Sequence, residues 1–310
     1  MTAAVSIPAD RPLWRKIWEF PLVAMVVALM AVGLALWAAQ WALYFALPPG
    51  LNEGLDAVLR GLVAVGAVFL VYKLVVVRLG RNPKDDLPLA GALGDTALGL
   101  GAGAAIFAVV VGAAAVFGVY RVFGWGTLDN WLPFFMAGGV FAGFVEEVVF
   151  RGIVFRWIEE LAGSWIALAF SSALFGLAHW ANPGATAFSS VAIALEAGIL
   201  LAGAYMLTRS LWLAIGIHAG WNLTQGLVFD VSVSGVEVDG LVEAGMRGSD
   251  LMTGGAFGLE ASVFALVVAT GAGLWLVWQA HRQGNVVPPM WRRARAGVPS
   301  RGGPVRGGRG

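Results

Sequence analysis

About eight long apolar runs, separated by short polar connections, are the feature that most limits how this chain can fold. A helix of about 20 apolar residues crosses a hydrocarbon core about 30 Å thick. Only 13% of the residues are charged, about half of what a soluble domain carries. We therefore predict an all-α, polytopic membrane helical bundle of about eight transmembrane helices. The runs occupy residues 21–47, 57–77, 96–120, 131–158, 164–180, 186–207, 210–229 and 259–280.

Lysine and arginine are unevenly distributed between the two sides that alternating spans define. One side receives the basic head, the connection 78–86 and the basic tail, whereas the other receives Arg60, Arg121 and Arg247. Cytoplasmic segments of membrane proteins are enriched in Lys and Arg. We therefore expect both termini in the cytoplasm and the acidic, glycine-rich segment 230–257 outside.

Composition divides the chain into three parts. Residues 1–20 form a cytoplasmic head, 21–282 the transmembrane helical domain, and 283–310 a basic tail without acids or apolar periodicity. A tail of this composition is predicted to be disordered. Gly and Ala are frequent in the run 96–120, which predicts close approach of that helix to a neighbour. The chain has no cysteine, which excludes disulfides and a thiol nucleophile.

Three charged side chains, Glu146, Glu147 and Arg151, lie within six residues of the fourth apolar run. A charge at bilayer depth costs about 2.5–3.5 kcal/mol on insertion scales, so these groups must pair or have a function. Glu147 and Arg151 are spaced i,i+4 and are predicted to pair on one helical face. Glu146 is turned about 100° away, which leaves its carboxylate free to face the interior of the bundle.

Other runs contribute His179, Glu196, His218 and Asn222. With a rise of 1.5 Å per residue, these groups and Glu146 lie about 12–22 Å from the cytoplasmic turns, so we expect them to converge on one polar cavity. Each group alone has a structural explanation. Together, a free carboxylate, two imidazoles and an amide can serve as general base, water or metal ligands, and oxyanion donor in hydrolysis. The role of Glu196 stays open.

These residues form three ordered motifs: Glu146-Glu147-x-x-x-Arg151, Phe175-x-x-x-His179 and His218-x-x-x-Asn222. The chain resembles the CPBP intramembrane proteases, the CAAX-protease and bacteriocin-processing (Abi) family, with a similar core at about 131–229. The resemblance implies a membrane-embedded endopeptidase whose site contains all six of these acidic, basic and amide residues. By the resemblance, Glu146 and His179 activate water, His218 and Asn222 hold the oxyanion or shape the site, and Glu147 and Arg151 form a structural pair.

The family is named for metalloproteases, so a divalent metal such as zinc is the cofactor to test. If one is bound, Glu146, His179 and His218 are the available ligands. The resemblance further implies a multi-pass protein of a bacterial inner (plasma) membrane, surrounded by lipid. Its substrate is expected to be a hydrophobic or lipidated peptide or protein, with no nucleic acid as partner.

Two other functions remain open at this point. One is a non-catalytic membrane protein of bacteriocin self-immunity or a scaffold that kept the fold. The other is a proton-coupled transporter that uses Glu146, Glu196 and the histidines as a relay. Hydrolysis also requires water, which we expect to enter the cavity from the cytoplasmic side.

Overall fold

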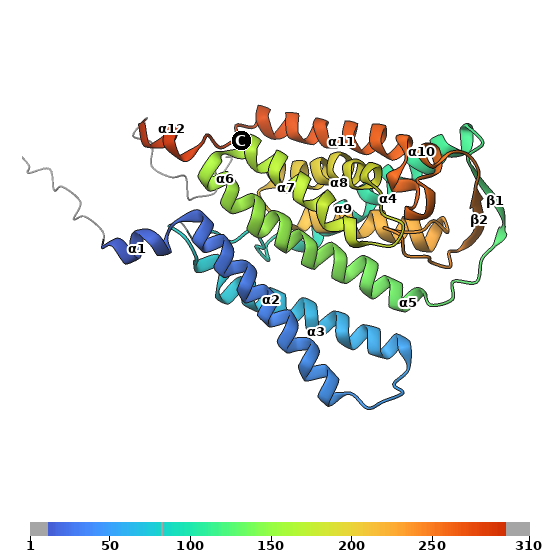
Figure 1. Ribbon diagram of the computed structural model, residues 1–310, viewed down its shortest axis with the longest axis horizontal. Helices are drawn as coiled ribbons and strands as arrows, with labels where there is room; N and C mark the ends of the chain where they lie inside the picture. Colours follow the sequence, from blue (N-terminus) through green and yellow to red (C-terminus); the bar gives the residue numbers. More distant parts are fainter. Residues whose placement is uncertain (1–11, 82, 296–310) are drawn as a thin grey trace, which may run out of the picture.

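The computed structural model describes residues 12–81 and 83–295, which form a helical bundle with one small two-stranded sheet (Figure 1). The all-α fold predicted from the apolar runs is confirmed. The longer helices are α2 (Pro21–Ala46), α3 (Glu53–Leu74), α4 (Ala92–Val116), α7 (Ser164–Ala178), α8 (Ala187–Thr208), α9 (Trp212–Leu223) and α11 (Val263–Arg282). Between α4 and α7 lies one continuous helix made of α5 (Trp131–Phe134), η2 (Phe135–Glu146), η3 (Val148–Phe155) and α6 (Arg156–Ala162). The short elements are α1 (Leu13–Trp18), η1 (Val76–Arg78), η4 (His179–Ala181), η5 (Thr224–Val228), α10 (Asp250–Thr253), η6 (Gly255–Phe257), η7 (Leu259–Ala261) and α12 (Met290–Arg295).

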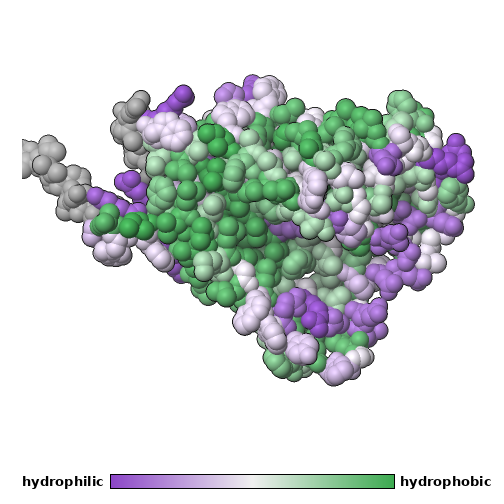
Figure 2. All heavy atoms as spheres, viewed as in Figure 1, coloured by the Kyte–Doolittle hydropathy of each residue, from purple (hydrophilic) through white to green (hydrophobic). Residues whose placement is uncertain are grey.

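Within the described residues, seven helical segments are long and apolar enough to cross a membrane. The predicted run 210–229 forms α9 followed by η5, and this stretch is shorter than the other seven. Apolar side chains cover the middle of the bundle, and hydrophilic ones gather near the two-stranded sheet (Figure 2). This distribution is what a multi-pass membrane protein requires, because lipid covers the apolar belt. The seven segments are Pro21–Ala46, Glu53–Arg78, Ala92–Val116, Trp131–Ala162, Ser164–Ala181, Ala187–Thr208 and Val263–Arg282.

The bundle has two chemically different ends. At the basic end, α1, α6 and α12 lie together (Figure 1). This end holds most of the lysines and arginines, including Lys73, Arg78 and Arg209. At the opposite end, here called the sheet end, acids such as Asp230, Glu237 and Asp239 predominate. The charge asymmetry seen in the sequence is therefore an asymmetry of the folded bundle.

The sheet end is closed by a pair of strands that the apolar runs did not predict. β1 (Tyr120–Trp125) pairs antiparallel with β2 (Val242–Met246), with an irregularity between Val122 and Gly124. The Tyr120 hydroxyl donates to the carbonyl oxygen of Phe229 at 2.9 Å, and the Asp230 carboxylate accepts from the backbone N–H of Gly240 and Ala244, each at 3.0 Å. These bonds fix the long segment after η5 over the ends of the helices.

Helices α4 and α9 are in direct backbone contact. A Cβ atom added at Gly103 would lie 2.1 Å from the carbonyl oxygen of Ile217, and one added at Gly216 would lie 2.3 Å from that of Thr96. A Cβ atom added at Gly99 or Gly220 would likewise overlap a backbone carbonyl oxygen of the facing helix. These four glycines, the glycine seam, confirm the close approach predicted for the third apolar run. Since α9 contains His218 and Asn222, the seam fixes the distance between α4 and one wall of the site.

The start of the tail differs from the disorder predicted for residues 283–310. The backbone N–H of Ser164 donates to the carbonyl oxygen of Val287, and the backbone N–H of Val287 donates to the Ser164 hydroxyl oxygen. The Asn285 amide donates to the carbonyl oxygen of Leu207 at 2.9 Å. Residues Met290–Arg295 then form α12. The turn between α6 and α7 offers backbone groups that the tail satisfies, which composition alone does not reveal. Residues 1–11 and 296–310 of the predicted head and tail lie outside the described residues.

Orientation in the membrane can be tested directly because the chain lacks cysteine. We expect a cysteine at Asp239, at the sheet end, to react with a membrane-impermeant maleimide in intact cells. A cysteine at Gln283, which follows α11 at the basic end, should react only after the membrane is permeabilised. Reaction of both variants from the same side would contradict the predicted topology.

Candidate active site

The helix that contains both glutamates is wider than an α-helix. Residues of η2 and η3 form π-helical turns, in which hydrogen bonds span i→i+5 rather than i→i+4. Such turns are rare and occur frequently at functional sites. The carbonyl oxygen of Gly138 in η2 accepts a bond from the side-chain amide of Asn222 in α9 at 2.9 Å. The wide helix thereby holds one of the predicted site residues through its backbone.

Glu147 and Arg151 form the ion pair that their spacing predicts. The Arg151 Nη1 atom lies 2.8 Å from Glu147 Oε1, and both side chains are fully buried. Arg151 also donates from Nη2 to the carbonyl oxygens of Ala197 and Gly198 at 3.3 Å, and its guanidinium carbon lies 4.4 Å from the centre of the Phe175 ring. The pair therefore joins η3 to α7 and α8, and its loss would leave a buried charge unpaired.

His218 lies between the two adjacent glutamates. Its Nδ1 atom is 3.0 Å from Glu147 Oε1, and its Nε2 atom is 4.0 Å from Glu146 Oε2. Because an ionised carboxylate only accepts, Nδ1 is the donor in the first contact. Glu147 thus holds two partners, Arg151 and His218, where the sequence predicted only one. The imidazole of His218 is oriented with Nε2 towards Glu146.

Glu146 is the less constrained of the two acids. Its Oε2 atom is buried, with no hydrogen-bond partner in the described part of the chain, and its side chain as a whole is 31% exposed. Buried polar atoms are normally paired. A water bonded to both Glu146 Oε2 and His218 Nε2 would satisfy both atoms, since 4.0 Å is short enough for one water at about 2.8 Å from each. The predicted difference between the two acids is present in the structure.

His179 ends α7 and is held by the same motif that contains Phe175. Its Nδ1 donates to the Phe175 carbonyl oxygen at 2.7 Å, and the two rings are 4.6 Å apart. This bond leaves Nε2 of a neutral imidazole as an acceptor. The contacts among the described residues do not join the side chains of His179 and Glu146 directly.

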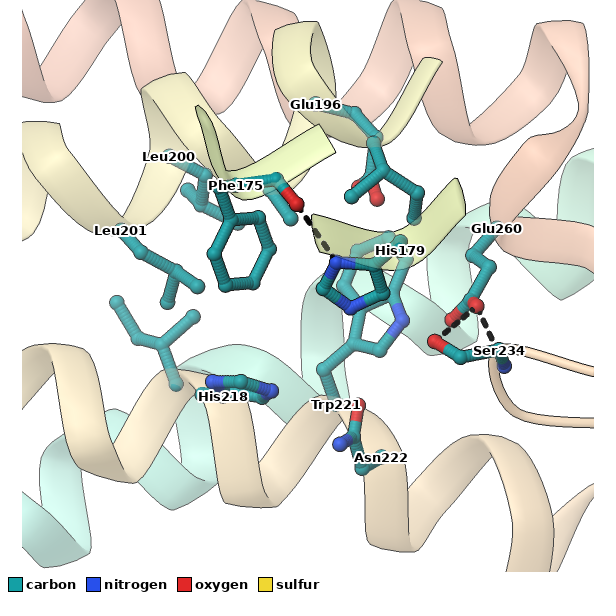
Figure 3. A pocket seen from close by; sticks show the side chains of 13 residues that line it. Phe175, His179, Glu196, Leu200, Leu201, His218, Trp221, Asn222, Ser234 and Glu260 are labelled. Carbon is teal, nitrogen blue, oxygen red and sulfur yellow. Dashed lines mark hydrogen bonds between the residues drawn. The ribbon is translucent and has the colours of Figure 1, made fainter. Parts of the chain in front are cut away.

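A cavity lies between α7, α8, α9 and the segment that follows η5 (Figure 3). It offers about 30 Å³ to the centres of water molecules, enough for about two waters because one needs roughly 10–15 Å³. The cavity brings His179, His218, Asn222 and Glu196 together, as the depth argument predicts, whereas Glu146 and Glu147 are not among its lining residues. Its lining residues are Phe175, His179, Ile193, Glu196, Ala197, Leu200, Leu201, Ile217, His218, Trp221, Asn222, Ser234 and Glu260.

Part of the cavity wall comes from the sheet end. Two of its lining residues, Ser234 and Glu260, belong to the segment between η5 and α11 at that end. Helix α7 ends at Ala178, with His179 as its C-cap, and the long segment after η5 folds against the site there. Entry of water from the cytoplasmic side stays a prediction.

Glu260 is a site residue that the sequence argument missed. Its Oε1 accepts from the backbone N–H and the hydroxyl of Ser234 at 2.6 and 2.8 Å, and the residue is only 2% exposed. Burial raises the pKa of this carboxyl to about 7, although the bonds from Ser234 act in the opposite direction. An acid inside the predicted apolar run 259–280 was the signal that could have identified it.

The predicted metal ligands do not form a ligand set. No group of three histidines, aspartates or glutamates in the described residues is close enough to hold a metal ion. The Nδ1 atoms of both His179 and His218 are bonded to protein oxygens, which leaves the Nε2 atoms as the nitrogens that could face a metal. The described residues thus show no ligand set for a metal, and a metal held by Glu146, His179 and His218 stays a prediction.

Together, the fold and these contacts define a multi-pass membrane protein with a buried carboxylate and imidazole site between its helices. Residues 127–224 match the family described as type II CAAX prenyl endopeptidase Rce1-like. This match confirms the resemblance expected from the three motifs, spans all six predicted site residues, and indicates a CAAX-type intramembrane protease. No curated protein and no solved structure matches the chain.

Proposed function

We propose that this protein is an intramembrane endopeptidase that hydrolyses peptide bonds with water activated by a glutamate and histidines. The observation that supports it most is Glu146 Oε2, a buried carboxylate oxygen that faces Nε2 of His218 and has no hydrogen-bond partner among the described residues. The adjacent cavity has room for water and contains a second oriented imidazole, that of His179. A structural ion pair alone does not require this free oxygen.

In the proposed reaction, a water molecule bonded to Glu146 and to Nε2 of His179 attacks the carbonyl carbon of the scissile bond. Glu146 takes one proton of that water as general base. The carbonyl oxygen becomes an oxyanion, which a donor near the site must stabilise. When the C–N bond breaks, the leaving amine takes the proton back from Glu146, so the carboxylate is regenerated.

The side chains of His218 and Asn222 are the proposed oxyanion donors. The Asn222 amide nitrogen gives one hydrogen to Gly138 and keeps a second one, because an amide has two. For His218 to donate, Nε2 must carry a proton while Nδ1 remains bonded to Glu147. Arg151 holds Glu147 and has no direct part in the chemistry.

The substrate that fits these features is a hydrophobic or lipidated peptide that reaches the site within the membrane. The apolar side chains of such a peptide can pack against the apolar wall of the cavity without a cost for removing them from water. We place the protein in the plasma membrane of a bacterial cell. Peptide cleavage by the purified protein distinguishes this proposal from the immunity and transport alternatives, because neither of them requires it.

The test compares two histidines of the same chain. Purified protein in detergent is incubated with a fluorogenic hydrophobic peptide library, with His179→Ala and His281→Ala as matched variants. We expect turnover by the original chain and by His281→Ala, since His281 lies in the last turn of α11, and a loss of at least about 100-fold in His179→Ala. Equal turnover by the two variants would contradict the proposed role of His179.

A further inference from the structure

The wall of the cavity formed by α8 and η7 contains two buried carboxyl groups. Glu196 in α8 is 1% exposed and Glu260 in η7 is 2% exposed. The Oε2 atom of Glu196 is buried and has no hydrogen-bond partner among the described residues. Figure 3 shows that both side chains lie beside the space that His179 also borders. The proposed hydrolysis does not use either acid.

Within the described residues, no lysine or arginine pairs with these two acids in the cavity. None of the lining residues is a lysine or an arginine. The nearest arginine of the site, Arg151, is already paired with Glu147 and with two backbone carbonyls. A buried charge without a partner is strongly unfavourable, so buried carboxylates are paired with a cation or kept protonated. When the two carboxyls are ionised, the cavity is therefore complementary to a cation that comes from outside the chain.

The shape and the walls of the cavity indicate what kind of cation. Its volume leaves room for about two water-sized groups, which corresponds to an ammonium group and the methylene attached to it. A guanidinium is planar and has three nitrogens, and is too large for this space. The apolar side chains of Ile193, Leu200 and Ile217 line the cavity and suit an alkyl chain.

We propose that the Glu196 and Glu260 wall binds the ammonium group of a lysine side chain of the substrate peptide, next to the scissile bond. This inference rests on the proposed endopeptidase function for its biological meaning, but binding of the ammonium group itself does not. The ammonium group enters first and its charge ends between the two carboxyls, while the alkyl chain that follows lies along the apolar wall. It thereby places the neighbouring peptide bond beside His179 and His218.

Protons compete with the ammonium group for the same carboxyls. Around Glu260, the titratable groups are Glu196 of α8 and His218 of α9, and the neutral partners are Ser234 and Gln225. Because the pKa of Glu260 is about 7, its ionised fraction rises between about pH 6 and about pH 8. Ammonium binding should strengthen over the same interval.

A thermal-shift experiment tests the site without requiring proteolysis. The purified full chain in detergent is heated with n-propylammonium chloride, with sodium chloride at the same ionic strength, or with 1-propanol. At about pH 8 we expect propylammonium alone to raise the melting temperature by about 2–5 °C at ten times its Kd, and by less at about pH 6. The rise should disappear in Glu196→Gln and persist in Glu243→Gln, an exposed acid of β2.

Absence of a shift in the original chain, or an equal shift in Glu196→Gln, would overturn the proposal. Glu260→Gln provides a second variant if Glu196→Gln does not fold, and it must also lose the shift. A cleavage assay then distinguishes the proposed ammonium site from the proposed endopeptidase activity. With peptides that differ only by lysine or norleucine beside the scissile bond, Glu196→Gln should raise the KM of the lysine peptide by about 10-fold or more and leave the norleucine peptide unchanged. If no peptide is cleaved but propylammonium binds, the proposed function fails and the ammonium site stands.

Discussion

Replacement of Glu146 by glutamine is expected to reduce peptide cleavage by about 100-fold to 10,000-fold and to leave the fold intact. The amide cannot take a proton from the attacking water, and loss of a general base costs about this much. The side chain is 31% exposed, and its buried oxygen has no protein partner in the described residues. Its replacement therefore removes no internal bond that the structure depends on.

The measurement for Glu146 pairs turnover with thermal stability. Glu243→Gln is the matched control, because it makes the same chemical change at an exposed acid of β2. The free energy of unfolding of both variants should lie within about 1 kcal/mol of that of the original chain, as is usual for substitutions at surface or unpaired positions. Only Glu146→Gln should lose turnover. Full activity in Glu146→Gln would exclude the carboxylate as the base.

Loss of either partner of the Glu147 and Arg151 pair is expected to destabilise the protein by about 3–5 kcal/mol, the usual cost of breaking a buried pair. Both side chains are fully buried, so Glu147→Gln leaves the guanidinium without its carboxylate. Arg151→Met leaves Glu147 with only His218. The double variant should lose less unfolding free energy than the sum of the losses in the two single variants, because it removes both charges together.

A second i,i+4 pair of the same chain is the control. Arg60 and Asp56 in α3 lie 2.6 Å apart, but their side chains are 37% and 32% exposed. Such pairs contribute about 0–1 kcal/mol, so Arg60→Met should hardly change the melting temperature. Equal losses of stability for Arg60→Met and Arg151→Met would show that burial does not make the Arg151 ion pair more important for stability than the Arg60 ion pair.

The sequence was sufficient for those parts of the site that depend on spacing along one helix. The Glu147 and Arg151 contact follows from an i,i+4 spacing, and it survives even though the helix has π-helical turns. The bond of His179 to the carbonyl oxygen of Phe175 is local in the same sense, and so is the apolar character of each span. Depth along the helices also predicted that His179, His218 and Asn222 would line one cavity.

The remaining parts depend on contacts between distant segments, which a helical period does not encode. His218 is 71 residues from Glu147, so nothing in the sequence shows that one carboxylate would serve both Arg151 and His218. The pairing of β1 with β2 and the position of Glu260 likewise depend on how the segment after η5 folds back. The same folding determines that part of the cavity wall comes from the sheet end.

The glycine seam has a consequence for how sequence variation in this protein should be interpreted. Helix α4 contains none of the six predicted site residues, yet a methyl group at Gly99 or Gly103 would overlap the backbone of α9. To relieve that overlap, α9 would have to shift, and His218 and Asn222 would shift with it. In a deep mutational scan scored by activity, these α4 glycines would group with the catalytic positions despite having no side chain to contribute. A position of this protein that does not tolerate substitution can therefore be needed for the close approach of two helices, and not only for a catalytic side chain.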